Sequence, residues 1–304
     1  MARRQAAGHR AALLLCSLRL GACGTLAMLS TGCSVSDLAT ADRLARGLVV
    51  VLPGIEGRSR LNIDIARGLN DGGVGMAVEI FDWNAPVPFV PLVNLADLVR
   101  NKAQAKRLAQ RIEQYHRDYP GRDVYVIGHS AGGGIALLTV EALPRQAPVT
   151  AAVLLAPAVS PEYDLTEALR RTRVGIFSFH SPSDVLFLEL GTRTFGTVDR
   201  RLGSAAGASG FRQPATGAAR DLYDQKLFDI GWRKEMSRSG NGGDHFGWAN
   251  PLFVRDYLAP LIVDQQSGEW PSGVWADLIE SARVEHHARA IDNNDAEQAV
   301  RGRK

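Results

Sequence analysis

Cysteine is scarce in this 304-residue sequence, and its three cysteines, Cys16, Cys23 and Cys33, all lie near the start. A body of the chain without cysteine cannot form an internal disulfide. Uncharged apolar runs near the start are also short, because the longest within residues 1–32, residues 20–32, is below the roughly 20 residues that span a membrane. These absences exclude a disulfide-framework protein and disfavour a permanent transmembrane helix.

The chain also has no large excess of positive or negative charge. The formal net charge of +3 falls to −1 when the four arginines of residues 1–32 are removed. No basic face is implied, so the sequence gives no ground for nucleic-acid binding. His and Cys residues show no metal-ligand spacing and no phosphate-binding loop is present, so no metal or cofactor is expected.

The composition is that of a folded chain. Hydrophobic residues make up 45% and charged residues 22%, enough apolar side chains to form a buried sheet. We expect a single domain over residues 47–263. A polar extension over residues 264–304 is expected to contain one docked helix around Trp275 and to be partly disordered.

Residues 1–32 have the layout of an export signal, with arginines at the start and a small, apolar stretch after them. The segment Leu29-Ser30-Thr31-Gly32-Cys33 resembles the lipobox of bacterial lipoproteins, which implies lipidation of Cys33 and attachment to a membrane of the cell envelope. Residues 33–46 would then be a tether. Cys23 is an alternative site, and a plain cleaved signal or a retained N-terminus are the other interpretations.

Short β-branched or apolar runs alternate with stretches long enough for helices, which predicts a parallel sheet with helices on both faces. The expected strands are Leu48–Leu52, Ala77–Phe81, Val124–Gly128, Ala151–Leu155 and Val174–Phe179. The expected helices are Leu61–Leu69, Leu92–Tyr119, Ala131–Leu143 and Leu165–Arg171. Residues 201–245 show no clear period and are expected to be irregular loops around a site.

The segment Gly128-His129-Ser130-Ala131-Gly132 joins a predicted strand to a predicted helix. A serine at such a sharp turn projects its hydroxyl above the sheet, and small neighbours let the two elements pass closely. With this context, the chain over residues 47–260 resembles the α/β-hydrolase superfamily. The resemblance implies that Ser130 is a nucleophile.

A serine hydroxyl needs a base and an acid to activate it. Of the seven histidines, His245 lies in a glycine-flanked late loop, where the resemblance places the catalytic histidine. His129 is set aside because the resemblance implies that its side chain points elsewhere. Asp184, at the turn after the strand that ends near residue 179, is the expected acid, and Asp164, one strand earlier, is its rival.

Acyl hydrolysis also needs two donors for the oxyanion of the tetrahedral intermediate. The resemblance implies the backbone N–H groups of Ile55, after the first strand, and of Ala131. The proline-rich segment 82–91 carries Trp83 and Phe89, which either line an acyl pocket or only cover the fold.

The expected activity is therefore serine-dependent hydrolysis of a carboxylic ester, lipase-like or esterase-like, through an acyl-enzyme. A small-molecule or lipid ester is the expected substrate. A thioesterase, peptidase or acyltransferase would use the same triad, and a non-catalytic cell-envelope lipoprotein would keep only the fold.

Overall fold

The central element of the fold is a parallel sheet. The computed structural model describes residues 35–84, 97–184, 197–201, 203–214 and 216–284. Six strands pair in the order β2-β1-β3-β4-β5-β6, and all neighbours are parallel. Their bounds are β1 Leu48–Leu52, β2 Ala77–Ile80, β3 Val124–His129, β4 Val149–Leu155, β5 Thr172–His180 and β6 Leu227–Gly231. The predicted fold class, a parallel sheet flanked by helices, is confirmed.

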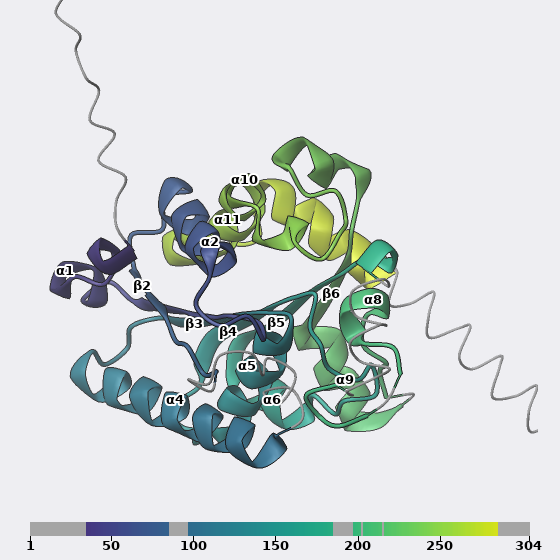
Figure 1. Ribbon diagram of the computed structural model, residues 1–304, viewed down its shortest axis with the longest axis horizontal. Coiled ribbons are helices and arrows are strands. Elements are labelled where there is room, and N and C mark those ends of the chain that lie inside the picture. Colours follow the sequence, from purple (N-terminus) through teal and green to yellow (C-terminus); the bar gives the residue numbers. More distant parts are fainter. Residues whose placement is uncertain (1–34, 85–96, 185–196, 202, 215, 285–304) are drawn as a thin grey trace, which may run out of the picture. The chain divides into compact units, whose positions relative to one another are not determined.

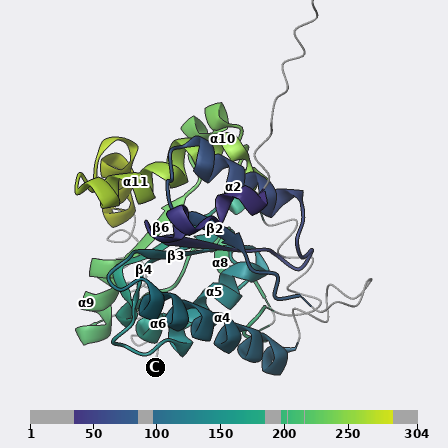
Figure 2. The same ribbon diagram turned by 90° about the vertical axis from the view of Figure 1, so that its left-hand side faces the viewer.

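Helices cover both faces of this sheet. In Figures 1 and 2, α2, α10 and α11 lie on one face, and α4, α5, α6 and α9 lie on the other. The helix bounds are α1 Ala41–Leu44, α2 Arg60–Asp71, α4 Leu98–Asp118, α5 Ala131–Ala142, α6 Thr166–Arg170, α8 Ala206–Ser209, α9 Gly217–Lys226, α10 Pro251–Phe253 and α11 Ala259–Ser267. A π-helical turn, Val254–Leu258, joins α10 to α11.

The strands are apolar throughout because the sheet is buried on both faces. All residues of β1 are buried, and their side chains alternate between two core clusters. Leu48 and Val50 pack with α4 and α5, whereas Val49 and Val51 pack with α2 and α11. A continuous apolar run, rather than an alternating one, follows from this arrangement.

Residues 201–245 are more regular than expected, which corrects the sequence-based interpretation. They contain α8, α9 and the edge strand β6. The strand was missed because Asp229 interrupts its apolar run. In the fold this buried carboxylate accepts a hydrogen bond from the Phe211 N–H at 2.9 Å and lies 3.3 Å from His180 Nδ1, so it has polar neighbours inside the sheet edge.

The expected tether is also folded where it is described. Residues 35–44 form a 3₁₀ turn, Val35–Leu38, and the helix α1. Leu38 is 1% exposed, and the Arg43 guanidinium donates to the carbonyls of Val74 (2.7 Å) and Met76 (2.9 Å). A buried leucine and these hydrogen bonds hold this segment against β2 and α2.

At the other end, a helix over residues 273–284 packs on the sheet. Trp275 is completely buried, and its indole N–H donates to the Tyr257 carbonyl at 2.7 Å. Residues 1–34 and 285–304 lie outside the described residues, and so does the expected lipidation site Cys33. None of the helices described is long and apolar enough to cross a membrane.

Candidate active site

Ser130 occupies the sharp turn between β3 and α5. Its φ of 56° and ψ of −123° are unusual for a residue with a side chain, and its main-chain N–H donates to the Leu155 carbonyl at 2.8 Å. Such strain is maintained only when the surroundings fix it. Ser130 itself is 9% exposed, at the end of a strand and the start of a helix, as the motif predicts.

Two glycines of the motif permit this turn. A Cβ on Gly128 would collide with the main chain of Gly132, and a Cβ on Gly132 would collide with the carbonyls of Leu52 and Pro53. The start of α5 therefore lies directly against the end of β1. Because only glycine fits there, the sequence pattern brings the nucleophile turn against the loop that follows the first strand.

Asp184 and His245 form a buried pair. Both carboxylate oxygens of Asp184 lie 3.0 Å from His245 Nδ1, and the two residues are 1% and 6% exposed. The carboxylate can only accept when ionised, so Nδ1 carries the proton and Nε2 is left as the basic nitrogen. Residues 61 positions apart in the sequence thus make one acid–base unit.

The acid is held by a tight turn after β5. Asp184 ends the 3₁₀ turn Pro182–Asp184, and its N–H donates to the Ser181 carbonyl at 3.0 Å. Burial raises the pKa of the Asp184 carboxyl, and the hydrogen bond from His245 opposes this shift. The imidazole therefore compensates in part for the desolvation of the carboxylate. This compensation is strongest when the imidazole is charged.

The base is held by a loop with its own polar support. The buried Asn241 side chain accepts from the Gly243 N–H at 2.9 Å, and Asp244 accepts from the N–H groups of Phe246 (2.9 Å) and Gly247 (3.1 Å). Asp244 thus stabilises the loop that carries His245. The loop is fixed on both sides of the imidazole-bearing residue.

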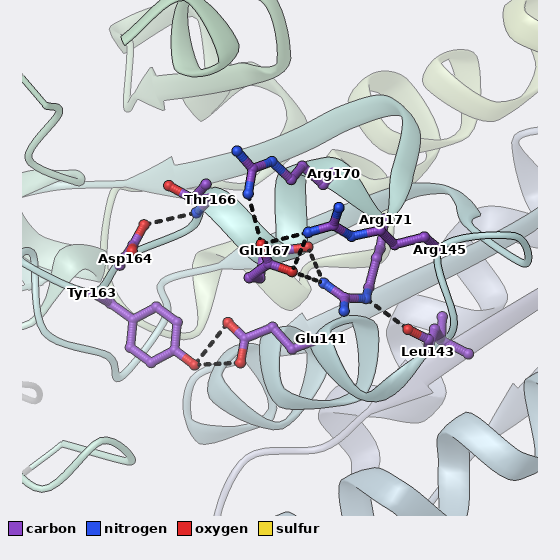
Figure 3. Close-up of polar contacts among 9 residues, drawn as sticks. All are labelled: Glu141, Leu143, Arg145, Tyr163, Asp164, Thr166, Glu167, Arg170 and Arg171. Carbon is purple, nitrogen blue, oxygen red and sulfur yellow. Dashed lines mark hydrogen bonds and ion pairs between the residues drawn. The ribbon is translucent and has the colours of Figure 1, made fainter. Parts of the chain in front are cut away.

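Asp164, the rival acid, lies elsewhere. Its carboxylate accepts from the Thr166 N–H at 2.9 Å, as Figure 3 shows, and from the Tyr223 hydroxyl at 3.3 Å. These hydrogen bonds lower the pKa of Asp164. The structure pairs His245 with Asp184, while Asp164 caps the turn before α6.

The two expected oxyanion donors lie at the places that the motif implies. Ala131 is the first residue of α5, and Ile55 lies in a turn closed by the Gly57 N–H, which donates to the Gly54 carbonyl at 3.3 Å. Among the described residues, neither the Ile55 N–H nor the Ala131 N–H has a hydrogen-bond acceptor.

Trp83 packs against the loop that follows β1 and contains Ile55. The indole is completely buried and donates to the Pro53 carbonyl at 2.7 Å, and the neighbouring Asn84 amide donates to the Gly54 carbonyl at 3.0 Å. Its observed contacts are thus with the loop, and contact with a substrate stays a prediction. Phe89, the other residue expected to line a pocket, lies outside the described residues.

Two polar residues near the site were not found from the sequence. Glu56 accepts from the Gly54 N–H at 3.2 Å, and burial raises the pKa of its carboxyl, while main-chain hydrogen bonds and, after them, His245 oppose the shift. His129 contacts His245, contrary to the expectation that its side chain points elsewhere. Within the described residues no group of three or more His, Cys, Asp or Glu side chains could hold a metal.

One family model matches a part of the chain that contains this turn. Residues 98–183 match the family described as serine aminopeptidase, S33. The matched segment contains Ser130 but ends one residue before Asp184 and does not reach His245. It thus covers less than half of the chain.

Several solved structures are similar in fold. Lipase B of Aspergillus fumigatus is 14% identical (TM-score 0.44), and the match covers 79% of this chain and 58% of that one. Est1E from Butyrivibrio proteoclasticus is 13% identical (TM-score 0.42; 73% and 88% covered). Bacillus licheniformis lipase BlEst2 is 16% identical (TM-score 0.42; 73% and 92% covered). No curated protein matches the chain.

Proposed function

We propose that this chain is a serine hydrolase that cleaves a carboxylic ester through an acyl-enzyme. The observation that carries the proposal is the buried pair of Asp184 and His245, in a fold whose strained turn presents Ser130. A pair of this kind has a recognisable chemical role, because the carboxylate fixes the tautomer of an imidazole that serves as base.

The proposed reaction assigns each of these groups the proton step that its chemistry allows. Ser130 Oγ attacks the carbonyl carbon, and its proton passes to Nε2 of His245. The N–H groups of Ile55 and Ala131 would donate to the oxyanion that forms. The proton then passes from His245 to the leaving alcohol, and water repeats the sequence to release the acid and restore Ser130.

Amide hydrolysis is a second candidate, favoured by the match to a family described as serine aminopeptidase. The same residues would serve, because His245 can protonate a leaving amine as it does an alcohol. The two candidates differ in the leaving group alone. Matched substrates with one acyl group, offered as an ester and as an arylamide, distinguish them by their relative kcat/KM.

The test of the proposal compares the wild-type chain with Ser130→Ala on short-chain and long-chain p-nitrophenyl esters. Removing the nucleophile should lower kcat by at least about 1,000-fold and abolish labelling by a fluorophosphonate probe. Equal rates for the two proteins would contradict the proposal. A wild-type chain that neither labels nor turns over any ester or amide would favour a non-catalytic lipoprotein that keeps the fold.

The membrane attachment remains a proposal supported by the sequence of residues 29–33 alone. If Cys33 is lipidated, the folded domain starts two residues later, at the turn Val35–Leu38, and would lie close to the membrane surface. A lipid or membrane-derived ester would then be a suitable substrate. Mass spectrometry of the mature N-terminus should find a diacylglyceryl-modified Cys33, and an unmodified chain that begins near Met1 would contradict this.

A further inference from the structure

His129 is the last residue of β3 and directly precedes the nucleophile. Side chains alternate along a strand, so His129 lies on the same face as Tyr125 and Ile127. Those two residues belong to the core cluster that also contains Trp248 and Ala249, which follow His245 in the sequence. The alternation of β3 therefore directs His129 toward the segment that carries the proposed base.

The contact between the two histidines is direct. His129 Nε2 lies 2.9 Å from the main-chain carbonyl oxygen of His245, and the ring centroids are 4.9 Å apart. A carbonyl oxygen can only accept, so His129 donates from Nε2 and its neutral ring has no proton on Nδ1. Within the described residues Nδ1 has no hydrogen-bond partner, so this donation is the polar contact of the ring.

The His129 ring is uncharged over the pH range in which a histidine base works. It is 2% exposed, and burial, followed by the neighbouring His245, lowers the pKa of His129 to about 3. A neutral ring matters here because the His245 imidazole gains a proton during the proposed reaction. A second charged imidazole at this distance would disfavour that step.

We propose that His129 is a positioning residue for His245: its Nε2–H holds the His245 carbonyl and so fixes the main chain of the base beside the nucleophile turn. The inference rests on the proposed function. Asp184 holds the ring of His245 at Nδ1, and His129 holds the backbone of the same residue. Two hydrogen bonds, one to the side chain and one to the main chain, define where Nε2 of His245 lies.

Gln and Met at position 129 form a matched pair for the test. Both have about the length of histidine and no charge, but only glutamine can donate to the carbonyl. We expect His129→Met to lower kcat by about 10- to 100-fold with KM changed less than about twofold, because a small displacement of a base slows proton transfer. His129→Gln should recover most of kcat, and fluorophosphonate labelling should slow in parallel with kcat.

His116→Met is the control, since His116 is a half-buried histidine on α4 away from the site. It should leave kcat within about twofold of wild type. Equal kcat for His129→Met, His129→Gln and wild type would overturn the inference, as would equal losses in Met and Gln. If Ser130→Ala also keeps full activity, the proposed function fails instead, so the two failures are distinguishable.

A spectroscopic measurement keeps the inference testable if a variant does not fold. In the wild-type chain with ¹⁵N-labelled histidine, His129 should show the neutral tautomer protonated at Nε2 throughout about pH 5–9. A His129 signal that titrates in this range, or that carries its proton on Nδ1, would overturn the proposed donation to His245.

Discussion

At the scale of single residues, the site depends on a few hydrogen bonds between groups that are distant in the sequence. Asp184 accepts from His245 Nδ1, and that contact selects which nitrogen of the ring is basic. The other acid that the sequence allowed, Asp164, bonds instead to the N–H of Thr166. The two carboxylates therefore have different partners, Asp184 a histidine ring and Asp164 the main chain of a turn.

Separate substitution of the two acids checks this assignment. Asp184→Asn should lower kcat by about 100- to 10,000-fold, because an amide at this position no longer favours the Nδ1-protonated tautomer or stabilises the imidazolium. Asp164→Asn should leave kcat within about threefold of wild type. The measurement is kcat on the best ester found. A large loss in Asp164→Asn with little change in Asp184→Asn would reverse the assignment.

At the scale of secondary-structure elements, the nucleophile turn depends on how closely α5 approaches β1. Gly132 lies against the carbonyls of Leu52 and Pro53, which belong to the main chain and cannot rotate away. Gly134, one half-turn further along α5, instead faces the side chain of Val198 at 2.7 Å from an added Cβ. The same helix thus meets the main chain at the end of β1 through Gly132 and a side chain outside the sheet through Gly134.

This difference predicts unequal effects of the same substitution. Gly132→Ala should displace α5 from β1, destabilise the fold by about 1–3 kcal/mol and lower kcat, since Ala131 begins that helix. Gly134→Ala should have the smaller effect on kcat, because its clash is with the side chain of Val198 and not with the end of β1. Urea unfolding and kcat, measured on both variants, test this. A Gly134→Ala variant with the larger kcat loss would show that the approach of α5 to β1 does not control the site.

At the scale of the whole molecule, two core clusters lie on opposite faces of one sheet, and a buried carboxyl at the edge of one cluster predicts a pH-dependent stability. Glu141, at the end of α5, accepts from the Tyr163 hydroxyl at 3.0 and 2.9 Å, and Figure 3 shows the pair facing each other. Burial raises the pKa of Glu141 from 4.5 to about 7. The folded chain thus keeps a proton that the unfolded chain releases.

The sign of the resulting pH dependence follows from linkage. The Glu141 proton favours the folded chain below about pH 4.5, and this contribution is lost as the pH rises to about 7. Glu141→Gln still accepts from Tyr163 but cannot ionise. It should therefore gain stability relative to wild type as the pH rises from 5 to 8, by about 1–3 kcal/mol after allowance for partial exposure. Urea unfolding of both proteins at pH 5 and pH 8 measures the change, and a constant difference would contradict it.

The sequence by itself determined the parallel sheet, five of its strands and the turn that holds Ser130. These features are local: continuous apolar runs reflect burial on both faces, and glycines at fixed offsets reflect a close approach of two elements. The edge strand Leu227–Gly231 was not predicted, because Asp229 interrupts its apolar pattern. The buried Asp229 carboxylate contacts Phe211 and His180, which are distant in the sequence.

Only the tertiary structure decided which acid meets His245 and what His129 does. Asp164 and Asp184 both follow strands, so spacing along the chain could not separate them. The contact of His129 depends on which face of β3 the His245 loop covers, and that face is set by the packing of helices distant in the sequence. The local pattern determines the position of a residue in its strand or turn. Long-range packing determines which residues its side chain contacts.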